Sequence, residues 1–182
     1  MRVIAGLCKG QRLVAPHQAQ TRPTSDRVKT IMFDIIGSRV FDAATLDVFA
    51  GSGSLGIEAL SRGARAADFV EAHAATGFIL RKNLQATHLD NHARVIINDA
   101  FLFLGSERAD EKYDLALVDP PYERGFGERT LRSLCDNRRL ASGAWVVIEE
   151  SARVKNMALP EEVRLIKQCV VGDTVLYIFE AR

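Results

Sequence analysis

The tetrapeptide Asp119-Pro120-Pro121-Tyr122 is the segment of this sequence with the most specific chemistry, and it follows an apolar run that ends at Val118. Two consecutive prolines remove two backbone donors and stiffen the chain. The segment therefore presents acceptors, namely the Asp119 carboxylate and the Pro120 carbonyl. Tyr122 adds a flat aromatic face on which a nucleic-acid base can stack.

Two acceptors beside an aromatic ring suit an exocyclic amine of adenine, guanine or cytosine. Such an amine is a poor nucleophile because its lone pair is conjugated with the ring. Acceptors that hold its two protons aim the lone pair at a methyl donor, which is catalysis by orientation and charge stabilisation. The segment contains no cysteine, which argues against covalent attack at a pyrimidine carbon. The alternative is a rigid loop that only shapes a turn.

A glycine-rich turn, Gly51-Ser52-Gly53-Ser54-Leu55-Gly56, follows an earlier apolar run and opens a helical pattern. Glycines let the backbone turn tightly and approach a ligand closely. Glu71 lies twenty residues after Gly51, where a carboxylate can accept hydrogen bonds from ribose hydroxyls. The pattern predicts a cofactor that contains adenosine, and both NAD and S-adenosylmethionine fit it. A tight turn without a ligand is the simpler alternative.

Two further carboxylates stand at similar places in the pattern. Asp47 lies in the strand before the glycine turn and is a candidate structural carboxylate. Asp99 ends the third strand, where it can accept a hydrogen bond from an adenine amine or cap the helix that starts at Ala100. These two roles of Asp99 are compatible.

The segments that position these motifs alternate between strand and helix. Strands are expected at 45–50, 67–71, 94–98, 113–118, 144–149, 163–170 and 174–180, and helices near 55–62, 74–87, 100–107 and 126–138. This alternation predicts an α/β fold with a mostly parallel, doubly wound sheet covered on both faces. Ligands of such sheets bind at the carboxyl ends of the strands, where every motif above falls.

The first forty residues differ from the rest in pattern and charge. Residues 2–6 and 11–15 predict a hairpin, and Thr24 or Ser25 is a candidate cap for a helix that runs to Ile36. Residues 1–40 carry seven Lys or Arg against two Asp, a net charge of +5, whereas the whole chain has +1. A basic extension (1–40) on a larger domain (41–182) suggests a polyanionic partner, or simply a solvated basic surface.

Composition excludes several classes of protein. The 182 residues suit one soluble domain, and no apolar run has the length of a membrane span. The three cysteines are far apart and show no zinc-site spacing, so we expect reduced thiols, no metal and a cytoplasmic location.

Over nearly its whole length the sequence resembles the bacterial 16S rRNA guanine-N2 methyltransferases of the RsmD type. The glycine turn and the Asp-Pro-Pro-Tyr motif occur in many methyltransferases. The segment Lys9-Gly10-Gln11-Arg12-Leu13 also matches, and the segment Arg22-Pro23-Thr24-Ser25-Asp26-Arg27-Val28 is what narrows the resemblance to this family.

The resemblance implies a Rossmann-like class I methyltransferase with a seven-stranded sheet whose last strand is antiparallel. It implies S-adenosylmethionine as cofactor, a guanine of 16S rRNA at residues 119–122, and a small-subunit assembly intermediate as the partner of a monomer. The implied cofactor residues are Asp47, Phe49, Ala50, Gly51, Ser52, Gly53, Gly56, Glu71 and Asp99. The candidate RNA-binding residues are Arg2, Lys9, Arg12, Arg22, Arg27 and Lys29.

The sequence departs from the family in one place. Family members often carry a second polar residue soon after the strand-two carboxylate, whereas Glu71 is followed by Ala72 and His73, so ribose binding rests mainly on Glu71. The competing functions are an adenine-N6 methyltransferase acting on DNA or RNA, a NAD-dependent oxidoreductase, and an RNA-binding module without catalysis. The oxidoreductase leaves the tetrapeptide and the basic segment unexplained.

Overall fold

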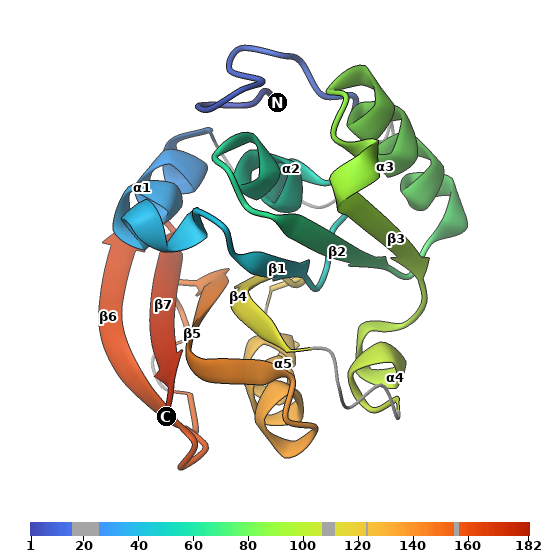
Figure 1. Cartoon of the computed structure of the whole chain (residues 1–182). Helices are drawn as coiled ribbons and strands as arrows, with labels where there is room; N and C mark the ends of the chain where they lie inside the picture. The colour runs from blue at the N-terminus through green and yellow to red at the C-terminus, as the bar shows by residue number, and fades with distance from the viewer. Residues whose placement is uncertain (16–25, 107–111, 123, 155–156) are drawn as a thin grey trace.

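The computed structural model describes residues 1–15, 26–106, 112–122, 124–154 and 157–182, and shows a seven-stranded sheet between two layers of helices (Figure 1). The strands are β1 (Ala44–Asp47), β2 (Ala66–Glu71), β3 (Ala93–Ile97), β4 (Tyr113–Val118), β5 (Leu140–Ser151), β6 (Val163–Val171) and β7 (Thr174–Ala181). The helices are α1 (Asp26–Ile36), α2 (Ser54–Ser61), α3 (Ala74–Ala86), α4 (Ala100–Leu104) and α5 (Phe126–Asp136), with short 3-10 turns η1 (Gly37–Val40) and η2 (Asp90–His92).

The strands lie in the order β3-β2-β1-β4-β5-β7-β6. Neighbours from β3 to β5 pair in parallel, whereas β7 runs antiparallel to both β5 and β6. The order reverses between β1 and β4, the point at which sheets of this kind bind ligands. The predicted seven-stranded, mostly parallel sheet with an antiparallel last strand is confirmed.

Each face of the sheet has its own core. Helices α1, α2 and α3 cover one face, and α4 and α5 cover the other (Figure 1). In β4, Leu115 and Leu117 join the first core, and Ala116 and Val118 join the second. Because both faces are covered, such strands read as continuous apolar runs. No helix within the described ranges is both long and apolar enough to cross a bilayer.

Most predicted boundaries agree with the structure to within a few residues. The first strand was predicted too long, because the chain leaves the ladder after Asp47 to enter the glycine turn. The helix expected near 100–107 ends at Leu104, where the Gly105 amide donates to the Phe101 carbonyl. β5 begins at Leu140, earlier than predicted, through an irregular pairing with the start of β4.

Residues 1–13 form a compact N-terminal strap. Val3 N donates to Gln11 O at 3.0 Å, and one antiparallel bridge joins Arg2 to Arg12. Val3 and Leu13 are buried in the core beneath α1, α2 and α3, so the strap and α1 share a core with the sheet. The predicted hairpin is confirmed. The candidate caps Thr24 and Ser25, and Arg22, lie outside the described residues.

The strap is attached to α2 through Glu58 and Ser61. The Glu58 carboxylate accepts hydrogen bonds from Ile4 N at 2.7 Å and Ala5 N at 3.0 Å. The Ser61 hydroxyl donates to Ala5 O at 2.6 Å. At Gly6, φ is +81° and a Cβ would stand 1.8 Å from the Ser61 carbonyl oxygen, so this close approach requires glycine.

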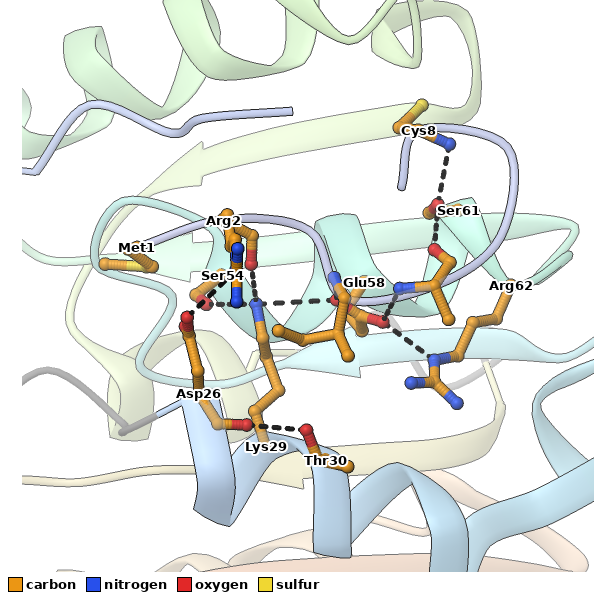
Figure 2. A network of polar contacts seen from close by, with 12 residues as sticks. Met1, Arg2, Cys8, Asp26, Lys29, Thr30, Ser54, Glu58, Ser61 and Arg62 are labelled. Atoms are coloured by element: carbon orange, nitrogen blue, oxygen red, sulfur yellow. Dashed lines mark hydrogen bonds and ion pairs between the residues drawn. The ribbon is translucent and has the colours of Figure 1, made fainter. Parts of the chain in front are cut away.

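Glu58 also lies between two cations (Figure 2). Lys29 Nζ is 3.4 Å from one carboxylate oxygen, and Arg62 Nε is 2.8 Å from the other. The side chains of Lys29 and Glu58 are both 0% exposed. Lys29 Nζ also donates to Arg2 O at 2.6 Å and to Ser54 Oγ at 3.1 Å. One buried cluster therefore joins the strap, α1 and the first residue of α2.

The prediction that Lys29 contacts RNA is wrong. Lys29 lies on the buried face of α1 with Val28, Met32 and Phe33, and its ammonium is directed at Glu58 rather than at solvent. Burial lowers the pKa of Lys29, and the neighbouring Glu58 carboxylate only partly offsets this effect. A buried, paired ammonium is not available to a phosphate.

Glu58→Leu is expected to lower the free energy of unfolding by about 3–5 kcal/mol, because removing one partner leaves the Lys29 ammonium buried without a countercharge. The two strap amides also lose their acceptor. Urea denaturation followed by circular dichroism measures the difference.

The double variant Lys29→Met/Glu58→Leu removes both buried charges and should recover part of the lost stability. Arg132→Met is the matched control, because it breaks an exposed i,i+4 pair with Glu128, 3.9 Å apart on α5. A loss from Glu58→Leu no larger than that of the control would contradict the assigned role of the cluster.

Candidate active site

The predicted site residues gather at the carboxyl edge of β1, β2 and β4. β1 ends at Asp47, β2 at Glu71, and β4 is followed directly by Asp119. β1 pairs with both β2 and β4, so these three strand ends are adjacent in the sheet. The charges of Asp119 and Glu71 both raise the pKa of Asp47, which reflects how close the three carboxylates lie.

The glycine turn has the backbone shape that only glycine adopts easily. Gly51 has φ +54° and Gly53 has φ +88°, both in the left-handed region. A Cβ at Gly51 would meet no atom within 4 Å, so the turn borders open space. A Cβ at Gly56 would stand 2.3 Å from the Phe69 ring, so this glycine lets α2 pack against β2.

Asp47 is a buried carboxylate that is hydrogen-bonded to the glycine turn. Its side chain is 1% exposed, and its carboxylate accepts a hydrogen bond from Gly56 N at 2.9 Å. Burial raises the pKa of Asp47 to about 7, and the neighbouring Asp119 and Glu71 add to this effect. The predicted structural role of Asp47 is therefore what the geometry shows.

Glu71 ties the end of β2 to the same turn. Its Oε2 accepts from Gly51 N at 3.0 Å and its Oε1 from His73 N at 2.8 Å. His73 therefore contributes a backbone donor that orients the carboxylate. Each carboxylate oxygen can accept a further hydrogen bond, so Glu71 suits ribose hydroxyls as well.

Asp99 caps α4. Its Oδ1 accepts from the amides of Phe101 at 2.8 Å and Leu102 at 3.1 Å, which confirms the predicted N-cap. Both cap bonds use the same oxygen, so Oδ2 can still receive a donor from a ligand. The second predicted role, an acceptor for an adenine amine, stays a prediction.

The tetrapeptide is anchored at its aromatic end. The Tyr122 hydroxyl donates to Glu149 Oε1 at 2.7 Å and lies 3.2 Å from Thr174 Oγ1. Asp119, Pro121 and Tyr122 are partly exposed, whereas Pro120 is buried. Burial and the Glu149 carboxylate raise the pKa of Tyr122 well above its ordinary value, so this phenol stays protonated.

The sequence interpretation missed two parts of this edge. One is the pair Glu149 and Thr174, which lie in β5 and at the start of β7. The other is the pair Phe101 and Phe126, which form an aromatic cluster with the predicted Phe49. Phe49 stacks on Phe126 at 6.1 Å, and Phe101 meets both rings edge-on. Glu149 and Phe101 lie at or just after the ends of predicted strands, whereas Thr174 and Phe126 are the first residues of a strand and a helix and carry no such signal.

The cluster also carries a cation. Arg129 Cζ of α5 lies 3.7 Å from the centre of the Phe101 ring. All three rings of the cluster are partly exposed. Phe49 follows β1, Phe101 follows Asp99, and Phe126 follows the tetrapeptide segment. Aromatic faces between these polar groups suit a planar ring bound at this edge.

These groups fit an adenosine-containing cofactor. The open turn at Gly51, the Glu71 carboxylate and the Asp99 carboxylate stand at three successive strand ends, next to aromatic rings. They are hydrogen-bond acceptors for ribose and adenine rather than a cation site. In the part of the chain that the structure describes, no three His, Cys, Asp or Glu side chains are grouped to hold a metal ion.

The remaining basic candidates lie on the surface. Lys9, Arg12 and Arg27 are exposed, and Arg2 is largely exposed with Asp26 3.4 Å from its Nε. With Lys29 buried, the strap and the start of α1 present these four cations to solvent.

The strand order, the antiparallel β7 and the carboxylates around the glycine turn define a Rossmann-like class I methyltransferase fold. The chain matches the family described as Conserved hypothetical protein 95 over residues 1–180. It belongs to this family, that of the RsmD-like methyltransferases.

Individual relatives cover almost the whole chain. It is 36% identical over 180 residues to Ribosomal RNA small subunit methyltransferase D of Escherichia coli K12, covering 99% of this chain and 89% of the relative. The Haemophilus influenzae protein of the same name is 35% identical over 173 residues, covering 94% and 89%. The solved structure of the candidate methyltransferase yhhF from Escherichia coli superposes with a TM-score of 0.90 at 34% identity, covering 100% and 98%.

Asp47 links stability to pH. Its folded pKa of about 7 lies above the ordinary 3.8, so the folded protein binds more protons than the unfolded chain between these values. Stability from this group is therefore lost as pH rises from about 4 to 7. Asp47→Asn keeps an acceptor for Gly56 N and should gain roughly 2–3 kcal/mol relative to the parent between pH 5 and pH 8.

Urea denaturation of the two proteins at pH 5, 6, 7 and 8 measures this gain. Free energies of unfolding that stay parallel over the series would contradict a titration of Asp47 in this window.

Proposed function

We propose that this protein transfers a methyl group from S-adenosylmethionine to the exocyclic N2 amine of a guanine in 16S rRNA, on a small-subunit assembly intermediate. The observation that carries the proposal is the placement of Asp119 to Tyr122 directly beside the carboxylates of the glycine turn. A methyl donor at the turn and an amine at the tetrapeptide are then neighbours. Relatives named for methylation of small-subunit ribosomal RNA support the choice of substrate.

The cofactor would be held by residues 49–56, Glu71 and Asp99, and when bound it supplies an electrophilic methyl group. Glu71 accepts from ribose hydroxyls, and Asp99 Oδ2 accepts from the adenine amine. The turn stays fixed meanwhile, because Asp47 and Glu71 already bind the amides of Gly56 and Gly51. Such a preformed site costs little reorganisation on binding.

On the substrate side, the Asp119 carboxylate and the Pro120 carbonyl accept the two protons of the guanine amine. This draws the nitrogen lone pair out of conjugation and directs it at the methyl group. The Asp119 carboxylate also stabilises the positive charge that develops on the nitrogen as the bond between sulfur and the methyl group breaks and S-adenosylhomocysteine is left. The proton that the methylated amine then loses passes along its hydrogen bond to Asp119. Tyr122 stacks on the base, and its protonated hydroxyl takes no part in proton transfer.

The basic surface of residues 1–40 would bind the rRNA backbone. Arg2, Lys9, Arg12 and Arg27 supply phosphate contacts that position the RNA without reading its sequence. The choice of base then rests on the pocket around the tetrapeptide.

The discriminating experiment is transfer of labelled methyl groups from S-adenosylmethionine to small ribosomal subunits, naked 16S rRNA and DNA in parallel, followed by nucleoside analysis. N2-methylguanosine from the ribosomal substrates supports the proposal. N6-methyladenosine would make the protein an adenine-N6 enzyme. Tight binding of NAD without binding of S-adenosylmethionine would favour an oxidoreductase.

Asp119→Ala is expected to reduce methyl transfer by at least about 100-fold, because one of the two amine acceptors and its stabilising charge are lost. Binding of S-adenosylmethionine, measured by calorimetry, should change little. Asp119→Asn keeps an oxygen acceptor and should retain more activity than Asp119→Ala. Wild-type activity in Asp119→Ala would point to an RNA-binding module without catalysis.

Lys9→Ala and Arg12→Ala are each expected to weaken binding of 16S rRNA and to reduce the slope of log affinity against log salt by about 0.7–0.9, the loss of one phosphate contact. Filter binding at several salt concentrations measures both quantities. Lys167→Ala, an exposed lysine on the edge strand β6, is the matched control and should bind like the parent. Equal salt slopes for all three variants and the parent would argue against the strap as an RNA surface.

A further inference from the structure

We propose that Glu149 is a positioning residue of the methyl-transfer site, which together with Thr174 fixes the ring of Tyr122 in the orientation that receives the base. The proposal rests on the function proposed above and adds two residues to it.

The topology of the sheet brings these groups together. Tyr122 follows β4, Glu149 lies in β5 next to β4, and Thr174 begins β7 on the other side of β5. Thr174 pairs with Ser151, two residues beyond Glu149, so Thr174 and Glu149 point to the same face of the sheet. The Tyr122 hydroxyl is held from this face by two strands.

The hydrogen bonds have one consistent direction. Glu149 has no proton to give when ionised, so the Tyr122 hydroxyl donates to its Oε1 at 2.7 Å. The tyrosine has then used its donor, and Thr174 donates its own hydroxyl proton to the phenol oxygen at 3.2 Å. Glu149 raises the pKa of Tyr122 and Thr174 lowers it, as expected for an acceptor and a donor.

Burial makes this anchor stiff. Glu149 is 2% exposed and Thr174 is 3% exposed, whereas the Tyr122 side chain is partly open to solvent. A hydrogen bond to a carboxylate in such surroundings is stronger than one in water. Because the hydroxyl stands at the far end of the ring, holding it fixes the direction of the long axis of the ring. The ring therefore has its orientation before a base arrives.

A stacking surface alone does not need a hydroxyl, since phenylalanine offers the same aromatic face. The hydroxyl and its two partners instead place the ring relative to the Asp119 carboxylate and Pro120 carbonyl, which must reach both amine protons at once. Errors near 1 Å in such an arrangement cost about 100-fold in rate.

The test compares Tyr122→Phe, Glu149→Leu, Glu149→Gln and the double variant Tyr122→Phe/Glu149→Leu in methyl transfer to small ribosomal subunits. Tyr122→Phe and Glu149→Leu should each lower kcat by about 10- to 100-fold, with affinity for S-adenosylmethionine within about twofold of the parent. Glu149→Gln keeps an oxygen acceptor and should restore most of the rate. The double variant should be no slower than the slower single variant, because both changes break one interaction.

Glu150→Gln is the matched control. Glu150 is equally buried at 2% exposed but lies on the opposite face of β5, where its Oε1 accepts from Ser151 N. It should leave kcat unchanged even where it lowers the melting temperature. The proposal is overturned if Tyr122→Phe keeps the full kcat, if the two losses multiply in the double variant, or if Glu150→Gln lowers kcat as much as Glu149→Leu.

A second readout does not depend on activity. In NMR spectra of the protein labelled at its three tyrosines, the Tyr122 hydroxyl proton, assigned with Tyr122→Phe, should exchange with water slowly in the parent and rapidly in Glu149→Leu. Rapid exchange of this proton in the parent would overturn the positioning role. Slow exchange in the parent with no methyl transfer to any RNA would instead overturn the proposed function while the anchor itself stands.

Discussion

The carboxylate of Glu58 is the interaction on which the rest of the molecule depends. It has no access to solvent, and it satisfies two backbone amides of the N-terminal strap together with the charges of Lys29 and Arg62. A buried carboxylate is costly unless its countercharges and donors are all in place. Because the donors come from the strap, from α1 and from α2, the cluster forms only when these three segments are docked (Figure 2). The basic strap and the helix that opens at the glycine turn are therefore one structural unit, joined further by the hydrogen bond from Lys29 to Ser54.

The same strategy recurs at the carboxyl edge of the sheet, where strand carboxylates hold the loops through backbone amides. Asp47 accepts from Gly56 N, and Glu71 accepts from Gly51 N and His73 N. Asp99 accepts from the amides of the second and third residues of α4. Backbone donors fix the shape of a loop without depending on its side chains. The cost falls on Asp47, whose burial among other carboxylates raises its pKa. The buried Asp47 thus lowers the stability of the fold at neutral pH, while its hydrogen bond from Gly56 N keeps the turn rigid and preformed.

Local patterns in the sequence predicted the sheet, the glycine turn and the tetrapeptide, because each depends on residues close together in the chain. The prediction for Lys29 was wrong because it used only the positive charge of the residue and its neighbours in sequence. The partner Glu58 is 29 positions away, and Lys29 becomes buried only when α1 docks. Glu149 was missed for a related reason. A carboxylate within a buried strand gives no periodic signal, and its link to Tyr122 appears only once β4 and β5 are neighbours. The aromatic cluster likewise joins three segments that only the topology brings together.

The antiparallel direction of β7 brings the Thr174 hydroxyl to the carboxyl edge of the sheet, which a parallel strand at this position would not do. In parallel strands only the carboxyl ends reach the ligand edge. β7 runs the other way, so its first residue, Thr174, arrives at the edge where β4 and β5 end. There its hydroxyl completes the hydrogen bonds around the phenol of Tyr122. Two rigid strands thereby hold the aromatic end of the tetrapeptide, while the prolines stiffen its other end. Because the proposed catalysis depends on orientation, this reversed strand contributes to the proposed active site as well as to the fold.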